Sequence, residues 1–263
     1  MIKIHPSAIV HKNAEIADNV TVGPYCIVGE FVKIGEGTEL CSNVIIDGDT
    51  VIGKNNKIFH SAVLGTEPQD LKYKGEPTRL RIGDENSIRE FATLNKSATM
   101  DEDVVIGNRN LLMAYTHVAH NCRLGNNIIL ANAVNLAGHV HIDDFAIIGG
   151  MTAVHQFVKI GAYAFVGGKS GAKKDVPPYT RGEGMPYEVV GINSVGLQRR
   201  GFSEEVIADI KKIYRLFYRS GLNVTQAIDE AEKSTDLSPE IICFIDFVKN
   251  SERGICRGRK SKS

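Results

Sequence analysis

The sequence has no tryptophan, no excess of charge of either sign and no long hydrophobic run. Lys and Arg together number 31, as do Asp and Glu, so the net charge is zero and a dedicated nucleic-acid binder is not expected. No apolar run approaches the length of a membrane span, and the repeat described below begins by residue 4. We therefore expect neither integral membrane association nor a signal peptide. The five cysteines form no CxxC pair, which predicts reduced thiols in a cytoplasmic protein.

What the chain does contain is an apolar residue at every sixth position. Of the 28 positions from Ile4 to Val166 in steps of six, 26 are Ile, Leu, Val or Met, and only Asp70 and Glu76 differ. A period of six fits neither a helix nor a simple strand, but it fits a short strand followed by a turn. Three such units close one coil of a triangular parallel β-helix, in which successive coils stack about 4.8 Å apart.

Two neighbouring positions of the repeat are also restricted. The residue after the apolar one is often glycine, as at Gly23 and Gly35, and we expect a corner with positive φ there. The residue two positions before the apolar one is often small or β-branched, as at Val20 and Thr38, and is expected to fill the narrow lumen.

The interruption and the end of the repeat define the domain organisation. We predict a mainly β fold: a parallel β-helix of hexapeptide repeats over residues 1–190, with an inserted loop at 66–81, followed by a small C-terminal α-helical domain over 191–263. Helices are expected from Ser203 to Gly221, from about Asn223, and from Ser238, where Ser-Pro-Glu is a typical helix start. The basic tail from Arg257 is expected to be unstructured.

Histidines are concentrated between residues 117 and 155, which contain five of the eight. If each coil repeats after three hexads, four of them fall in one stripe along an edge of the β-helix: His117, His120, His139 and His155. Gly138 and Gln156 occupy the same position of the repeat as His120, one and two coils further along. Neutral imidazole near pH 7 can take a proton from a hydroxyl that attacks a carbonyl, and a backbone N–H such as that of Gly138 could stabilise the oxyanion.

The same stripe leaves a second chemistry open, because three histidines can hold the zinc ion of a hydratase. The spacing of His117 and His120 is not the usual one for β-helical carbonic anhydrases, and no carboxylate signature accompanies it. We therefore predict no metal.

Several short runs are more specific than the repeat: residues 69–73 (QDLKY), 75–78 (GEPT), 117–122 (HVAHNC), 149–157 (GGMTAVHQF), 175–179 (DVPPY) and 199–203 (RRGFS). Together they resemble the UDP-N-acetylglucosamine O-acyltransferases, which catalyse the first step of lipid A biosynthesis, and the resemblance spans the whole chain. It implies a left-handed β-helix and a cytoplasmic homotrimer with active sites between subunits. It also implies transfer of a 3-hydroxyacyl chain to the 3-hydroxyl of the UDP-sugar, without a cofactor, from the phosphopantetheine thioester of acyl carrier protein.

The resemblance also implies roles for individual residues. His120 would be the general base and Gly138 the oxyanion donor. The sugar and thioester region would be lined by Asp70, Lys72, His117, His139, His155 and Gln156. The nucleotide and pantetheine arm would be bound by Asn193, Arg199 and Arg200, and the acyl groove would contain Phe165 and Gly168. The acidic carrier protein needs a basic docking face, for which the candidates are Lys159, Lys169, Lys173, Lys174, Lys211, Lys212, Arg215 and Arg219.

Three positions depart from the family pattern. Asn121 follows the base where Asp is common, so a backbone carbonyl is an alternative partner for His120. Val195 stands where Glu is common, and residues 184–188 lack a frequent His. The last two changes leave open the 3-amino analogue of the UDP-sugar, which would give an amide. Another hexapeptide acyltransferase and a non-catalytic β-helix scaffold are the remaining alternatives.

Overall fold

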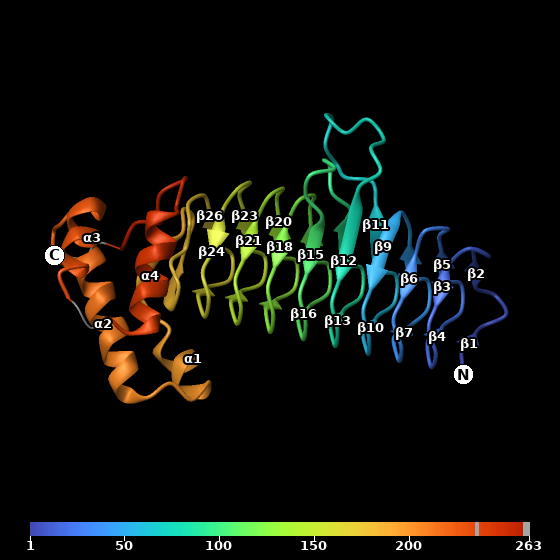
Figure 1. Cartoon of the computed structure of the whole chain (residues 1–263), viewed down its shortest axis with the longest axis horizontal. Coiled ribbons are helices and arrows are strands. Elements are labelled where there is room, and N and C mark those ends of the chain that lie inside the picture. Colours follow the sequence, from blue (N-terminus) through green and yellow to red (C-terminus); the bar gives the residue numbers. More distant parts are fainter. Residues whose placement is uncertain (235–236, 260–263) are drawn as a thin grey trace.

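The computed structural model describes residues 1–234 and 237–259. The chain winds as an elongated three-sided coil from the N-terminus to a group of helices at its other end (Figure 1). Each full turn contributes one short strand to each of three parallel sheets, called here sheets A, B and C. The predicted β-helix of hexapeptide repeats with a C-terminal helical region is confirmed.

Through β26, successive strands belong to sheets A, B and C in strict rotation. Sheet A contains β1 (Lys3–Ile4), β4 (Thr21–Val22), β7 (Glu39–Leu40), β10 (Lys57–Ile58), β13 (Ser87–Ile88), β16 (Leu111–Leu112), β19 (Ile129–Leu130), β22 (Ile147–Ile148), β25 (Phe165–Val166), β27 (Thr180–Glu183) and β28 (Glu188–Ile192). Sheet B contains β2 (Ile9–Val10), β5 (Ile27–Val28), β8 (Ile45–Ile46), β11 (Val63–Thr66), β14 (Thr93–Asn95), β17 (His117–Val118), β20 (Asn135–Leu136), β23 (Ala153–Val154) and β26 (Gly171–Ala172). Sheet C contains β3 (Glu15–Ile16), β6 (Lys33–Ile34), β9 (Asp49–Ile52), β12 (Arg79–Ile82), β15 (Val104–Ile106), β18 (Arg123–Leu124), β21 (His141–Ile142) and β24 (Lys159–Ile160). The β27–β28 pair is antiparallel and ends sheet A.

The lumen is filled by the two columns that the sequence predicted. Leu64 and Leu94, in the sixfold series, are fully buried, as is Val44 two positions before a member of the series. In the middle coils this second position holds an asparagine ladder, defined as Asn56, Asn86 and Asn110. The Oδ1 atoms of Asn56 and Asn86 each accept the backbone N–H of the next ladder residue at 2.9 Å. The polar groups of this ladder are therefore paired, as burial requires.

The corner geometry differs from our expectation. Of the glycines that follow the lumenal aliphatic residue, only Gly65 has positive φ; the left-handed residue instead lies three positions after that aliphatic, as at Asn43 (φ 58°) and Tyr115 (φ 62°). Glycine is required directly after the aliphatic for another reason. A Cβ atom on Gly23 would come within 2.5 Å of the carbonyl oxygen of Cys41 on the next coil. These glycines therefore permit close stacking of coils.

Two loops leave the coil, and both do so at the corner between sheets B and C. The first connects β11 to β12 and stands away from the coil in Figure 1. Thr66 and residues 79–81 belong to strands, so this loop covers 67–78 and is shorter than the predicted 66–81.

The second loop, residues 96–103 between β14 and β15, was not predicted. The register pairs Thr93 with His117, a separation of 24 residues, whereas His117 pairs with Asn135, a separation of 18. Six residues are thus added without changing the phase of the repeat. Met100, which fits the sixfold series, lies in this loop and is 69% exposed.

The C-terminal region contains α1 (Ser194–Arg199), α2 (Glu204–Arg219), α3 (Val224–Ala231) and α4 (Pro239–Lys249). Ser203 and Asn223 cap α2 and α3 as predicted, α4 begins at the predicted Pro239, and α1 was missed. Part of the tail prediction was wrong, because Gly258 bridges to Val189 and Arg259 forms an ion pair with Glu183 at 3.3 Å. Residues 260–263 of that tail lie outside the described residues. No helix in the described part of the chain combines the length and apolar character that a membrane span needs.

Candidate active site

His120 lies at the corner between sheets B and C, and its side chain is nearly buried. Its Nδ1 atom is 3.0 Å from Oδ1 of Asn121. Its ring meets that of His139 edge-on, with centroids 5.3 Å apart. On the other side of the ring, Nε2 faces Oδ2 of Asp70 at 3.6 Å. The outer nitrogen of this imidazole is therefore directed toward the 67–78 loop.

Asp70 is held in place by the loop that carries it. Its Oδ1 atom accepts the backbone N–H of Lys72 at 2.9 Å, which leaves Oδ2 to face His120. The loop is anchored by Asn95, whose Nδ2 donates to the Glu67 carbonyl at 3.0 Å, and by the Lys96 ammonium, which lies 5.2 Å from the centre of the Tyr73 ring. The first loop is thus part of the site.

His117 and His139 flank the base, and both have a lowered pKa. Burial is the main cause for each, and the neighbouring His120 lowers the pKa of both further. Glu102, 3.8 Å from Nδ1 of His139, acts in the opposite direction. Nδ1 of His117 is 2.8 Å from Oγ1 of Thr93. Both rings are therefore mainly neutral near pH 7 and can bind polar groups of a substrate without repelling a protonated base.

Gly138 lies over His120 in the next coil, as the column count predicted. A side chain at position 138 would overlap the imidazole at Cε1 and Nε2. Gln156 follows one coil further, beside an exposed His155 whose Nδ1 is 3.2 Å from the Gln156 carbonyl oxygen. The structure therefore places the predicted histidine stripe along one corner, and His120 makes the closest contacts within it.

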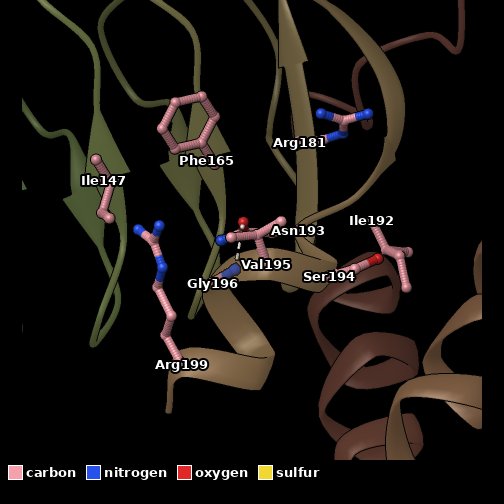
Figure 2. Close-up of a pocket in the computed structure, with 9 residues that line it drawn as sticks. All are labelled: Ile147, Phe165, Arg181, Ile192, Asn193, Ser194, Val195, Gly196 and Arg199. Carbon is pink, nitrogen blue, oxygen red and sulfur yellow. Dashed lines mark hydrogen bonds between the residues drawn. The ribbon is translucent and has the colours of Figure 1, made fainter. Parts of the chain in front are cut away.

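A pocket of about 370 Å³ lies elsewhere, where the outer face of sheet A meets α1 (Figure 2). Its apolar wall is formed by Ile147, Phe165, Ile192 and Val195, and Arg181 and Arg199 add two guanidinium groups. Asn193 supports the pocket, because its Oδ1 accepts the Gly196 N–H at 3.2 Å and its Nδ2 donates to the Tyr163 carbonyl at 2.9 Å. Two guanidinium groups beside an aromatic ring can bind a diphosphate and a flat base.

Some predicted residues lie in unexpected places. The Arg200 guanidinium stacks over Phe145, 4.6 Å from the ring centre, instead of joining Arg199. Phe165, predicted for the acyl groove, is in the pocket of Figure 2, while Gly168 follows β25 at the corner between sheets A and B. Sequence reasoning missed Arg181, because β27 lies beyond the repeat and no recognised motif contains it.

The histidine stripe and the pocket of Figure 2 lie on different faces of the coil. The histidine stripe follows the corner between sheets B and C, whereas the pocket of Figure 2 is on sheet A. The faces of a three-sided coil point in different directions, so the pocket of one chain is turned away from its own His120.

The zinc alternative has little geometric support. Within residues 1–234 and 237–259, no three His, Cys, Asp or Glu side chains are grouped so that they could hold a metal ion. The Nδ1 atoms of His120 and His117 are already engaged by Asn121 and Thr93.

Known proteins resemble this chain over its full length. A family profile described as UDP-N-acetylglucosamine O-acyltransferase, domain 2, matches residues 175–256, and a bacterial transferase hexapeptide profile matches residues 1–35. The acyl-[acyl-carrier-protein]–UDP-N-acetylglucosamine O-acyltransferase of Thermodesulfovibrio yellowstonii is 49% identical over 258 residues, which cover 98% of this chain and 100% of the relative.

Solved structures agree with that match. LpxA from Acinetobacter baumannii has a TM-score of 0.93 and 47% identity, covering 97% of this chain and 99% of its own. The UDP-N-acetylglucosamine acyltransferase of Arabidopsis has a TM-score of 0.85 and 36% identity, covering 97% of this chain and 100% of its own. This chain belongs to the UDP-N-acetylglucosamine O-acyltransferase family.

Proposed function

We propose that this chain transfers a 3-hydroxyacyl group from acyl carrier protein to the 3-hydroxyl of UDP-N-acetylglucosamine, the first step of lipid A biosynthesis, with His120 as the general base. The observation that carries the proposal is the setting of Nε2 of His120. This nitrogen belongs to a nearly buried ring, faces Asp70 at 3.6 Å and lies against the backbone of Gly138. A hydroxyl placed beside this pair can approach the base and the carboxylate at the same time.

The reaction follows from that position. Nε2 takes the proton of the sugar hydroxyl while its oxygen attacks the thioester carbonyl, and the Gly138 N–H stabilises the negative oxygen of the tetrahedral intermediate. When the intermediate collapses, the carbon–sulfur bond breaks and the imidazolium returns the proton to the departing thiolate. Asp70 and the neutral His117 and His139 orient the sugar. No cofactor is consumed.

The nucleotide is assigned to the pocket of Figure 2. Arg181 and Arg199 would bind the diphosphate, and Phe165 offers a face for the uracil ring. Because this pocket is turned away from His120 of the same chain, we propose that each site combines the histidine stripe of one chain with the pocket of another.

The outer surfaces of the coil support such an assembly. Sheets A and B carry apolar side chains toward solvent, among them Ile9 (66% exposed), Ile27 (43%) and Phe165 (38%). The corner between these sheets adds four more large side chains: Tyr25, Phe91, Tyr115 and Met151. Sheet C presents mainly charges, such as the ion pair of Lys33 with Glu15, and sheet A also carries an ion pair, between Lys57 and Glu39.

A homotrimer accounts for this distribution. Three chains around an axis along the A–B corner would place sheet A of each chain against sheet B of the next and leave sheet C in water. The axis corner and both apolar faces would then be covered.

Surface chemistry supports an assignment for the docking of the acyl donor and for the cellular location of the enzyme. Lys173, Lys174 and Arg257 line one pocket at the C-terminal end of the coil, and we propose that this basic face docks the acidic acyl carrier protein. All five cysteines are free thiols, which supports a cytoplasmic enzyme.

The function is tested by offering the purified chain a panel of 3-hydroxyacyl carrier proteins together with UDP-N-acetylglucosamine or its 3-amino analogue, with His120→Ala in parallel. Acylation of the normal sugar that is lost in the variant supports the proposal. Transfer to the amino analogue alone would keep the base and replace the ester with an amide. Wild-type protein that acylates neither sugar would overturn the assignment.

A further inference from the structure

Asn121, directly after the base, is the most completely bonded side chain near the site. It is fully buried, and its backbone is left-handed (φ 56°). Its Oδ1 atom accepts the backbone N–H of Ala98 at 3.1 Å and lies 3.0 Å from Nδ1 of His120. Its Nδ2 atom donates to Oγ1 of Thr99 at 2.9 Å. Because the Ala98 N–H can only donate, the amide oxygen must be the atom that faces it, and the orientation of the amide is determined.

That orientation determines the tautomer of His120. An amide oxygen only accepts hydrogen bonds, so the Nδ1 atom that faces it must carry the proton of the neutral ring. The lone pair is then on Nε2, the nitrogen that faces Asp70 and Gly138. The ring is therefore in the form that a general base requires before the substrate arrives.

The partners of Asn121 come from the second loop, residues 96–103. The Thr99 hydroxyl accepts the hydrogen bond from Nδ2, and the Ala98 backbone N–H donates to Oδ1. The hydrogen bonds from Nδ1 of His120 to Asn121 and from Asn121 to Thr99 therefore run in one direction. Hydrogen bonds that share one direction polarise one another.

We propose that Asn121 is a positioning residue for the base, and that Ala98 and Thr99 of the second loop hold its amide so that Oδ1 faces Nδ1 of His120. This inference rests on the proposed function. The tautomer of the base is thereby set by a neutral amide and not by an adjacent carboxylate. The role of the second loop is to close the back of the catalytic corner.

The charges around the base agree with this role. When Nε2 takes the proton, the ring becomes an imidazolium, and Asp70 faces it from the 67–78 loop while the Asn121 chain faces it from behind. The remaining titratable neighbours are His117 and His139, whose lowered pKa keeps them mainly neutral, with the carboxylates of Glu102 and Asp101 acting on His139. An aspartate at position 121 would add a full negative charge directly at Nδ1.

The pH dependence of kcat/KM separates positioning from mere support of the fold. In Asn121→Asp, the acid limb of the profile is expected to move up by about one pH unit, because an adjacent carboxylate favours the protonated ring. In Thr99→Val, the limb is expected to move down and kcat to fall about 3- to 10-fold, because the Asn121 amide loses the hydrogen bond that holds and polarises it. Asn121→Ala is expected to lose about 100-fold in kcat.

Asp103→Asn is a control within the same loop, because Asp103 pairs with Arg81 on sheet C, away from the base. Its profile is expected to superpose on that of the wild type. Thermal unfolding of each variant checks that the fold is retained.

A second readout needs no turnover. In full-length protein labelled with nitrogen-15 in histidine, and with His120→Ala used to assign the signals, the neutral His120 ring is expected to show its proton on Nδ1. A proton on Nε2 in the wild type would overturn the inference, as would an unmoved acid limb in both Asn121→Asp and Thr99→Val. If the wild type acylates no sugar, the proposed function fails, while the tautomer measurement still decides the inference.

Discussion

Gly138 lies directly over the imidazole of His120, one coil further along, and the space between them does not admit a methyl group. The close approach brings a backbone amide next to the reacting nitrogen. It also means that the position of the base depends on a residue 18 positions away in the sequence.

Gly138→Ala is therefore expected to displace the His120 ring and lower kcat by about 100-fold or more, the scale of losing an oxyanion donor or a base. Steady-state kinetics with saturating sugar measure this effect, and a melting curve close to that of the wild type would show that the coil is intact. Full activity in the alanine variant would contradict the stacking of Gly138 on His120.

Mixed assemblies test whether a site combines two chains. His120→Ala removes the base, and Arg199→Ala removes a guanidinium from the pocket of Figure 2. Each variant alone is expected to be nearly inactive. Co-expressed in equal amounts, they are expected to recover about a quarter of the wild-type activity, because random mixing gives that share of sites with both intact halves. Absence of any recovery in confirmed mixed trimers would place both halves within one chain.

The histidines predict how stability depends on pH. Burial lowers the pKa of His117, His139 and His141 from 6.5. As the pH falls below 6.5, the unfolded chain binds protons at these positions before the folded chain does, so the free energy of unfolding decreases. Urea denaturation at a series of pH values measures this slope.

His141 lies on sheet C, outside the histidine stripe. His141→Gln should therefore reduce the slope of unfolding free energy against pH without changing the site. A wild-type protein that becomes more stable between about pH 7 and pH 5.5 would argue against the burial of these rings.

The asparagine ladder predicts a large loss of stability for a small substitution. Asn86 donates to Oδ1 of Asn56 at 3.0 Å and to the Gly107 carbonyl at 2.9 Å, and its Oδ1 accepts the Asn110 N–H. Asn86→Ala leaves these buried partners unpaired and is expected to cost about 2–4 kcal/mol. Lys33→Ala, which removes only an exposed ion pair with Glu15, should change stability by less than about 0.5 kcal/mol. Equal effects of the two substitutions would contradict the ladder.

Metal removal separates the acyltransferase from the zinc alternative. Dialysis against EDTA is expected to leave the acyl-transfer rate unchanged, because proton transfer by His120 needs no Lewis acid. Metal analysis of the same sample accompanies the assay. A rate that falls on dialysis and returns with Zn²⁺ would favour the hydratase-type site.

The lumen could be predicted from the sequence because its constraint is local and repeats in every coil. Leu64 and Leu94 pack into the same lumen in equivalent positions of their coils, so a count of residues was enough to place them. The same count failed at Met100, since an insertion of one whole hexad keeps the phase and cannot be recognised by periodicity. The left-handed corners were also misplaced, because strand pairing on both sides imposes positive φ even on Tyr115.

The candidate site also has one part that could be predicted from the sequence and one part that could not. The stripe of His120, Gly138 and His139 followed from column arithmetic and matched motifs. The partners of Asn121 could not be predicted, because Ala98 and Thr99 lie in a loop of another coil whose conformation depends on its anchoring. Arg181 was missed for a related reason, since the antiparallel turn that carries it begins where the repeat ends.

Both loops leave the coil at the one corner that also carries His120, and neither supplies a side chain to the apolar core. A change in either loop therefore removes no side chain from that core, while it alters what surrounds the reacting hydroxyl. For protein engineering, the coil can be kept unchanged while residues 67–78 and 96–103 are varied to redesign which acceptor sugar the site prefers.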